Sequence, residues 1–293
     1  RVKKIKFKVN LFFKIKAAIN NLKFNKTEIF CLSAILGFGL VKIFINLINP
    51  PFGWDDLNYH FTFPVEWLKH GNLENPIVIM LDPSPTYYPI NGSLFYLWFI
   101  LPLKNVFIAD LGQIPFFFIA FIAVYSLAKK LNLSKEYSMF SASLFTLIPN
   151  YFKQLEIAYV DVMVAALFLV SLNCILSLRK SFSLSNITLC AISMGLLLGV
   201  KSLALVFTIL LILPILVIFI DNFKKIMFRK WIFVFILFFI FLILFGSFSY
   251  IRNFILTGNP LYPIDVEIFG KVFFKGAIDK INYAAHFVTS DYA

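Results

Sequence analysis

Residues 196–204 read Leu-Leu-Leu-Gly-Val-Lys-Ser-Leu-Ala and divide one apolar stretch, 186–220, near its middle. A transmembrane helix needs about 20 apolar residues, because it rises about 1.5 Å per residue across roughly 30 Å of hydrocarbon. The whole stretch is too long for one such helix, and a lysine is costly inside lipid. We therefore expect two helices joined by a tight turn, with Lys201 at the membrane surface.

The rest of the chain is also strongly apolar. Hydrophobic residues make up 60% of the sequence, charged residues only 14%, and the mean hydropathy is +0.85. Because this composition cannot cover a water-facing surface, we predict an all-α polytopic membrane protein with about seven transmembrane helices. The expected spans are 27–48, 105–128, 137–150, 157–178, 186–201, 202–220 and 231–250.

The basic residues set the expected orientation. The first 26 residues hold nine Lys and Arg and no acid, a block that keeps the N-terminus on the cytoplasmic side. If the short apolar segment 92–104 does not cross, every later basic loop falls on that same side. We therefore predict an interfacial or re-entrant helix there. Because the net charge of +12 gathers beside apolar spans, nucleic acid is not an expected partner.

This topology divides the chain into three parts. Residues 1–26 form a basic cytoplasmic segment, and 27–250 form a transmembrane module that includes the outer loop 49–104. Residues 251–293 form an extracytoplasmic segment that we expect to be truncated. The three cysteines all lie in apolar stretches, so no disulfide framework is indicated.

Two adjacent acids follow the first span, in Gly53-Trp54-Asp55-Asp56-Leu57-Asn58-Tyr59-His60. Asp55 could cap a surface helix that ends at Gly71, but capping explains one acid better than two. In a functional interpretation, one carboxylate is a general base on an acceptor hydroxyl, and the other orients that acceptor or binds a divalent cation. Asp56 and His60 would share a helix face, which is weak evidence for a transition metal.

Three further charges fall on the same predicted outer face. Asp161 opens an otherwise apolar helix, where it either serves a site or stabilises the helix N-terminus. Lys201 either extends its charge to the headgroups or, with Arg252 after the last span, clamps an anionic lipid phosphate. The sequence alone leaves these alternatives open.

More motifs follow the acidic pair in a fixed order: Tyr-Tyr-Pro-Ile-Asn-Gly at 87–92, Tyr-Val-Asp at 159–161, Gly-Val-Lys at 199–201 and Tyr-Ile-Arg-Asn at 250–253. Together they resemble the membrane module of GT-C type glycosyltransferases. The similarity is greatest to the branch with protein mannosyltransferases and aminoarabinose transferases, and it covers roughly residues 27–265. Such enzymes move a sugar from a polyprenyl-phosphate carrier to an acceptor on the non-cytoplasmic face.

The resemblance implies a GT-C membrane module with interfacial helices in the first outer loop, in a bacterial inner (plasma) membrane. It implies a polyprenyl-phosphate-linked sugar donor, a lipid, glycan or protein acceptor, and membrane lipids as partners. Asp55 and Asp56 match the acidic pair that activates the acceptor, with Asp56 as the expected ligand of a divalent metal cation. Lys201 matches a lysine near the carrier phosphate, and Arg252 is expected to assist it. The expected acceptor or substrate contacts are Asp161, Tyr88, Asn91 and His60.

One departure from the family pattern concerns Tyr87-Tyr88-Pro89, where many relatives have Lys-Pro-Pro, so a phosphate contact is not expected there. The alternative function is a transporter or flippase of lipid-linked or anionic solutes, in which the paired acids bind a coupling ion. A transporter predicts internal repeats or helices broken at mid-span. No repeat is evident in the sequence, and a glycosyltransferase is therefore the main prediction.

Overall fold

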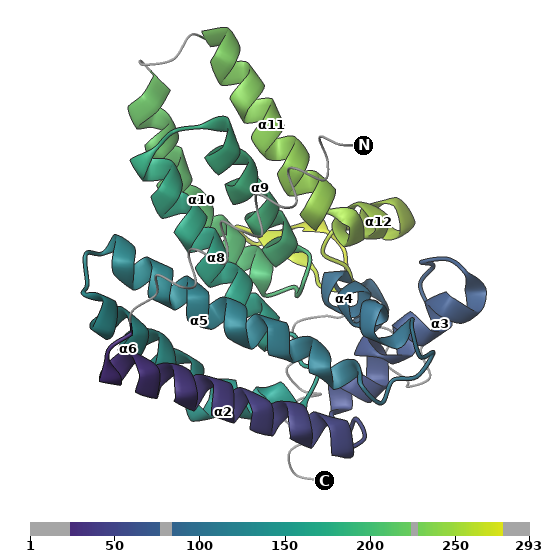
Figure 1. The fold of residues 1–293 in the computed structure, drawn as a ribbon. Helices are drawn as coiled ribbons and strands as arrows, with labels where there is room; N and C mark the ends of the chain where they lie inside the picture. The colour runs from purple at the N-terminus through teal and green to yellow at the C-terminus, as the bar shows by residue number, and fades with distance from the viewer. Residues whose placement is uncertain (1–23, 77–83, 224–227, 278–293) are drawn as a thin grey trace, which may run out of the picture.

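The computed structural model describes residues 24–76, 84–223 and 228–277. Predictions for 1–23 and 278–293 lie outside the described residues. The described chain is mostly helical, and its long helices form two groups (Figure 1). One group holds α2 (Lys26–Ile48), α5 (Gln113–Lys130) and α6 (Lys135–Thr146). The other holds α8 (Asp161–Lys180), α9 (Leu184–Leu198), α10 (Ala204–Phe223) and α11 (Phe228–Gly246).

Contacts between α5 and α8 join the two groups. In the first group α6 packs against α2 and α5, and in the second α9 packs against α8 and α11. Most buried side chains of both groups belong to one continuous apolar core, which includes Phe117, Met163 and Leu197. Many apolar side chains on the outside of the helices remain exposed, as expected for helices that face lipid.

Four helical segments are long and apolar enough to cross a membrane: Lys26–Ile48, Ala109–Lys130, Asp161–Lys180 and Ala204–Phe223. A fifth span is obtained if α11 and α12 (Phe248–Thr257), which meet at a 73° bend, are counted together. The predicted spans 137–150 and 186–201 do form helices, α6 and α9, but these have only 12 and 15 residues. The described residues therefore support an α-helical membrane protein without confirming seven spans.

The predicted hairpin is confirmed. The apolar stretch 186–220 is divided into α9 and α10, and Lys201 lies in the turn between them. A close approach of two glycines packs α9 onto α11. A Cβ atom on Gly246 would lie 2.5 Å from the carbonyl oxygen of Gly195, so only glycine fits without a shift of the backbone.

The outer loop contains several short helices. A π-helical turn η1 (Asp56–His60) leads into α3 (Thr62–His70), which ends at Gly71 in the left-handed conformation, as predicted. A 3-10 turn η2 (Ser84–Tyr87) then precedes α4 (Asn91–Ile100). The ten residues of α4 are too few to cross a membrane, in agreement with the interpretation of 92–104, and its place at an interface stays a prediction.

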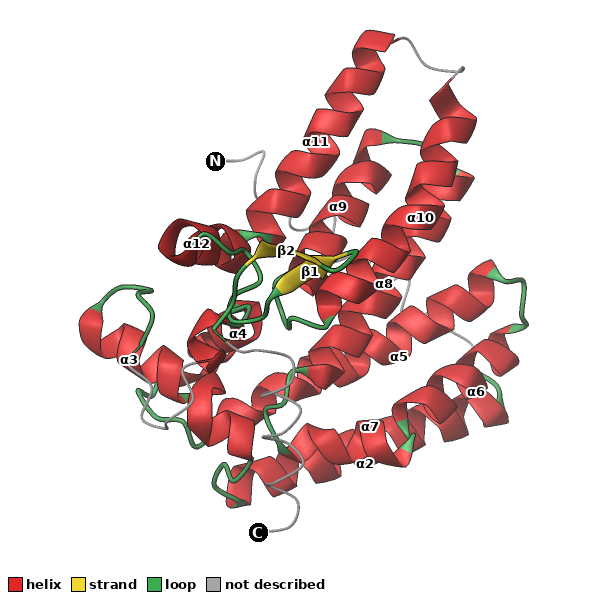
Figure 2. Ribbon diagram, turned by 180° about the vertical axis from the view of Figure 1, so that it is seen from behind, coloured by secondary structure: helices red, strands yellow, loops and turns green. Residues whose placement is uncertain are grey.

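The remaining elements are short. They are η3 (Ala109–Gly112), α7 (Pro149–Lys153), η4 (Gln154–Glu156), and the antiparallel strands β1 (Val266–Ile268) and β2 (Lys271–Phe274). The all-α prediction misses this hairpin of two strands, which lies beside the ends of α9 and α10 (Figure 2). Its turn is made by Phe269 and Gly270, both with positive φ.

Candidate functional site

A cavity of about 550 Å³ lies between the outer loop, the start of α8 and the turn from α9 to α10. We call it the charged cavity, because an acid and a lysine that are far apart in the sequence both line it. Its lining consists of Trp54, Asp55, Asn58, Tyr59, His60, Pro85, Tyr88, Pro89, Val160, Val200, Lys201, Ser202, Leu203 and Ile264. The predicted site residues Asp55, His60, Tyr88 and Lys201 are therefore brought together.

Asn91 and two glycines bring the walls of this cavity together. The Asn91 amide N–H donates to the carbonyl of Gly199 at 2.9 Å, and its side chain donates to the carbonyl of Phe245 at 2.8 Å. A Cβ on Gly199 would overlap the Asn91 side chain, and one on Gly92 would overlap Val160. Asn91 therefore docks α4 against the ends of α9 and α11, and its predicted contact with a substrate stays a prediction.

Asp55 lies at the cavity wall and is held by Tyr59. The Tyr59 hydroxyl donates to Asp55 Oδ2 at 2.9 Å, while the Asp55 side chain caps no helix amide. Burial, followed by the negative charge of Asp55, raises the pKa of Tyr59. The Tyr59 hydroxyl therefore stays protonated and donates a hydrogen bond to the Asp55 carboxylate. The capping interpretation of Asp55 is wrong. Tyr59 was not predicted as a site residue, although its spacing of four from Asp55 could have indicated the contact.

Asp56 is not in the lining of the cavity and is fully buried. Its Oδ2 accepts the Gly53 amide N–H at 3.1 Å. Burial raises the pKa of Asp56 to about 6, and the backbone amides of Ala158 and Gly53 offset part of that rise. The two adjacent acids thus have different surroundings: Asp55 can meet a solute, and Asp56 cannot without a movement of the loop.

Lys201 forms an ion pair with Asp161, with 2.7 Å between Nζ and Oδ1. The two side chains are 32% and 37% exposed, so solvent reaches both of them. The ion pair joins the turn after α9 to the first residue of α8. The structure thus brings Asp161 to the edge of the charged cavity through its contact with Lys201.

His60 lies deep in the same wall. Its Nδ1 is 3.0 Å from Ser93 Oγ, and its ring is packed against that of Tyr59. Burial, followed by the charge of Lys201, lowers the pKa of His60 to about 3. His60 is therefore neutral at pH 7 and adds no positive charge to the cavity.

Arg252 is not among the residues that line the charged cavity. Its guanidinium donates to the carbonyl of Thr86 at 2.8 Å and faces the ring of Phe248. The neighbouring Asn253 donates to the carbonyl of Tyr87 at 2.8 Å. Together these two residues of α12 hold the η2 turn, and a role for Arg252 at a donor phosphate stays a prediction.

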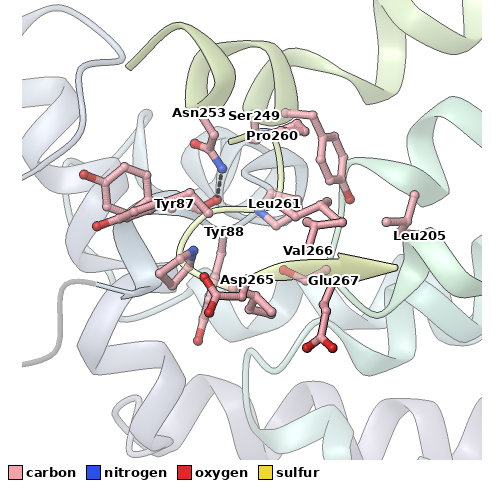
Figure 3. Close-up of a pocket in the computed structure, with 16 residues that line it drawn as sticks. Tyr87, Tyr88, Leu205, Ser249, Asn253, Pro260, Leu261, Asp265, Val266 and Glu267 are labelled. Atoms are coloured by element: carbon pink, nitrogen blue, oxygen red, sulfur yellow. Dashed lines mark hydrogen bonds between the residues drawn. The ribbon is translucent and has the colours of Figure 1, made fainter. Parts of the chain in front are cut away.

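A smaller cavity of about 300 Å³ adjoins the charged cavity. Figure 3 shows the side chains that line this smaller cavity. We call it the aromatic cavity, because four tyrosines line it: Tyr87, Tyr88, Tyr250 and Tyr262. Both cavities share Tyr88, Pro89, Ser202 and Ile264 in their linings. Asp265 and Glu267, from the start of the β-hairpin, add two carboxylates to the aromatic cavity, and neither was predicted as a site residue.

The described residues contain no group of three or more His, Cys, Asp and Glu side chains arranged to hold a metal ion. Asp55 and Asp56 do not converge, because one lines the cavity and the other is buried behind it. The donor set on the described residues therefore does not fit a metal held at Asp56. The divalent cation stays a prediction, and no step proposed below depends on it.

No family model, curated protein or solved structure matches the chain. The resemblance to GT-C glycosyltransferases therefore depends on the sequence motifs and their order alone.

Proposed function

We propose that this chain is a membrane glycosyltransferase of the GT-C type that transfers a sugar from a polyprenyl-phosphate donor to an acceptor. The observation that carries the proposal is the presence of Asp55 and Lys201 in the lining of one cavity. A transfer of this kind needs a base for the acceptor and a cation for the phosphate that leaves. In this proposal the protein resides in a bacterial plasma membrane, with the cavity on the extracytoplasmic side.

Asp55 is the proposed general base. Its carboxylate removes the proton from the acceptor hydroxyl, while the acceptor oxygen forms a bond to the anomeric carbon and the bond from that carbon to the phosphate oxygen breaks. The electron pair leaves with the polyprenyl phosphate. Tyr59 holds the carboxylate by its hydrogen bond at 2.9 Å, so the base is oriented before the acceptor arrives.

Lys201 is the proposed contact of the donor phosphate. Charge develops on the phosphate oxygens during transfer, and an ammonium group there stabilises it without giving up a proton. Asp161 holds Lys201 in place by the ion pair at 2.7 Å. Since both side chains are partly exposed, this ion pair is worth only about 0–1 kcal/mol, and a phosphate can share the ammonium group or replace the aspartate.

The surface next to Lys201 suits an isoprenoid tail. Leu203 follows the lysine in the turn, and Val206, Ile209, Leu210 and Leu213 continue as exposed apolar side chains along α10. A tail on this surface would lie in lipid while its phosphate reaches Lys201. In this proposal the acceptor enters through the adjoining aromatic cavity, where Tyr88 separates it from the donor.

The test uses purified protein in proteoliposomes with polyprenyl phosphates that carry a radiolabelled hexose, pentose or aminopentose. Membrane lipid, glycan and protein fractions are supplied as acceptors. We expect label from one donor to leave the polyprenyl lipid and appear in one acceptor fraction. If every donor stays intact over the whole set of acceptors, the proposed transfer is wrong.

The bend of 73° between α11 and α12 favours the transporter as a second candidate, because transporters bind their substrates at broken helices. A flippase would leave the label on the polyprenyl lipid and move it between leaflets. Oxidation of the sugar by external periodate measures this movement. If the sugar becomes sensitive to external periodate while it is still linked to the polyprenyl lipid, transport is favoured over transfer.

A further inference from the structure

A third cavity, of about 980 Å³, lies at the opposite end of α8 from the charged cavity. It is formed by the end of α5, the end of α8 and the start of α9. We call it the basic cavity, and its lining is Ser126, Lys129, Lys130, Leu131, Asn132, Leu176, Ser177, Arg179, Lys180, Ser181 and Asn186. Four of these side chains are cations, and none is an acid.

The four cations are not neutralised within the described part of the chain. None of Lys129, Lys130, Arg179 and Lys180 has an ion pair with a described carboxylate. Elsewhere in the helical bundle, three lysines form ion pairs with acids: Lys42–Glu156, Lys135–Glu28 and Lys201–Asp161. The basic cavity therefore carries an excess of positive charge that the described residues do not balance.

Several of the polar side chains are held in place by hydrogen bonds. Lys129 Nζ donates to the carbonyl of Leu133 at 3.1 Å. Lys130 Nζ donates to the carbonyl of Asn173 at 2.7 Å and to Ser177 Oγ at 2.6 Å, which uses two of its three N–H groups. The Asn186 side chain donates to the carbonyl of Ser181 at 2.8 Å. Because these groups are already oriented, a ligand would lose less entropy than on flexible surface lysines.

We propose that the basic cavity binds the phosphate of an anionic phospholipid headgroup. Phosphate oxygens accept several hydrogen bonds at once, and Arg179, the lysines and the hydroxyls of Ser126 and Ser181 can donate them. The Ser177 hydroxyl already donates to the carbonyl of Asn173. The proposal is independent of the function proposed for the charged cavity.

The location of the basic cavity favours a lipid over a soluble phosphate compound. Ala109–Lys130 and Asp161–Lys180 are both candidate spans, and the cavity lies where the two end. The 20 residues of α8 extend about 30 Å, the thickness of the hydrocarbon layer, so headgroups lie at this level. Leu131 beside the cations is 65% exposed and can contact the apolar part of a lipid.

The test measures binding of phosphatidylglycerol and of zwitterionic phosphatidylcholine to the detergent-purified protein by native mass spectrometry. The variant K129Q/R179Q removes two cations and keeps the Lys130 hydrogen bonds. The matched control, K104Q/K153Q, removes two exposed lysines outside the cavity and changes the net charge equally. We expect the wild type and the control to prefer phosphatidylglycerol, and K129Q/R179Q to lose at least about ten-fold in affinity for it.

Three outcomes would overturn the proposal. One is the absence of a preference for phosphatidylglycerol in the wild type. Another is an equal loss in K129Q/R179Q and K104Q/K153Q, which would indicate non-specific attraction to headgroups. The third is binding of inorganic phosphate or glycerol phosphate as tight as that of the lipid, which would identify a soluble ligand. Melting temperatures of K129Q/R179Q and the wild type are compared without lipid, and equal values show that the variant is folded.

Discussion

The two ends of α8 carry cavities that differ in charge. At its first residue, Asp161 pairs with Lys201, and Asp55 lines the same charged cavity. At its last residue, Lys180 joins three other cations in a basic cavity without an acid in its lining. A cavity with both signs of charge can accept a proton and stabilise an anion. A cavity lined by cations alone can bind an anion but offers no base.

The two cavities also differ in what holds their side chains. In the charged cavity, side chains bind other side chains: Tyr59 donates to Asp55, His60 contacts Ser93, and Lys201 pairs with Asp161. In the basic cavity, Lys129, Lys130 and Asn186 donate mainly to backbone carbonyls near the helix ends. Such a difference is expected if the first cavity must place reacting atoms and the second need only hold a headgroup.

The largest effect is expected for Asp55→Asn, which separates chemistry from binding. The amide keeps the size of the side chain and removes the base, so sugar transfer should fall by about 10²- to 10⁴-fold. Donor binding should change little, because Asp55 is not the proposed phosphate contact. Release of label from the polyprenyl donor in proteoliposomes measures the rate.

Glu66→Gln is the control for Asp55→Asn. Glu66 belongs to the same loop but pairs with Lys69 at 2.7 Å and with His70, outside the charged cavity. Transfer by this variant should stay within about two-fold of the wild type, since exposed ion pairs contribute little. Full transfer by Asp55→Asn would remove Asp55 from the mechanism and leave the charged cavity as a binding site.

A second comparison sets one lysine from each cavity side by side. Lys201→Gln should weaken binding of a fluorescent polyprenyl phosphate by about 10- to 100-fold, because a charged hydrogen bond to phosphate contributes about 1.5–3 kcal/mol. Lys129→Gln should change it by less than about two-fold. Equilibrium titration in detergent measures both affinities. Equal losses would mean that the donor recognises positive charge anywhere on the protein, and Lys201 would then have no special role.

Parts of this arrangement could be predicted from the sequence. Span length and the cost of a buried lysine were enough to place Lys201 in a turn between two helices. The sidedness of charges was enough to group Asp55, Asp161 and Lys201. The different surroundings of Asp55 and Asp56 were not predictable, because they depend on how the π-helical turn η1 packs against the start of α8.

The contacts of Arg252 and Asn91 could not be predicted from the sequence either. Arg252 contacts the η2 turn because α12 leaves α11 at an angle of 73°, and nothing in the apolar composition of α11 indicates that bend. Asn91 fills the space beside Gly199, a contact between residues far apart in the chain. Motif order indicates which residues share a face of the membrane, but packing decides which of them reach the cavity.

The close packing of α9 against α11 predicts an effect on stability. Gly246→Ala places a Cβ 2.5 Å from the Gly195 carbonyl oxygen, and forcing α9 and α11 apart should cost about 1–3 kcal/mol. Gly37→Ala in α2 is the matched control, since no atom lies within 4 Å of its added Cβ. Gly37→Ala should be neutral or stabilise by up to about 1 kcal/mol. Thermal unfolding in detergent measures both, and equal effects would contradict the close helix contact.

The last effect concerns two buried groups of the outer loop, His60 in the lining of the charged cavity and Asp56 beside it. Unfolding returns Asp56 from a pKa of about 6 to 3.8, so between these values the folded state holds a proton that the unfolded state has lost. Stability from Asp56 therefore falls as the pH rises from about 4 to 6. Unfolding returns His60 from a pKa of about 3 to 6.5, so the unfolded state binds the extra proton, and stability from His60 rises over the same range.

Each group contributes a slope of at most about 1.4 kcal/mol per pH unit, and the two slopes oppose each other, so they largely cancel in the wild type between pH 4 and 6. The Asp56→Asn variant keeps only the His60 contribution. Its free energy of unfolding should therefore rise more steeply between pH 4 and 6 than that of the wild type. His60→Gln leaves the Asp56 contribution, and its stability should decrease. Denaturant unfolding in detergent at several pH values measures the slopes. Slopes that shift in the same direction would contradict the opposite protonation of these two neighbours, and with it the burial that separates Asp56 from the solvated Asp55.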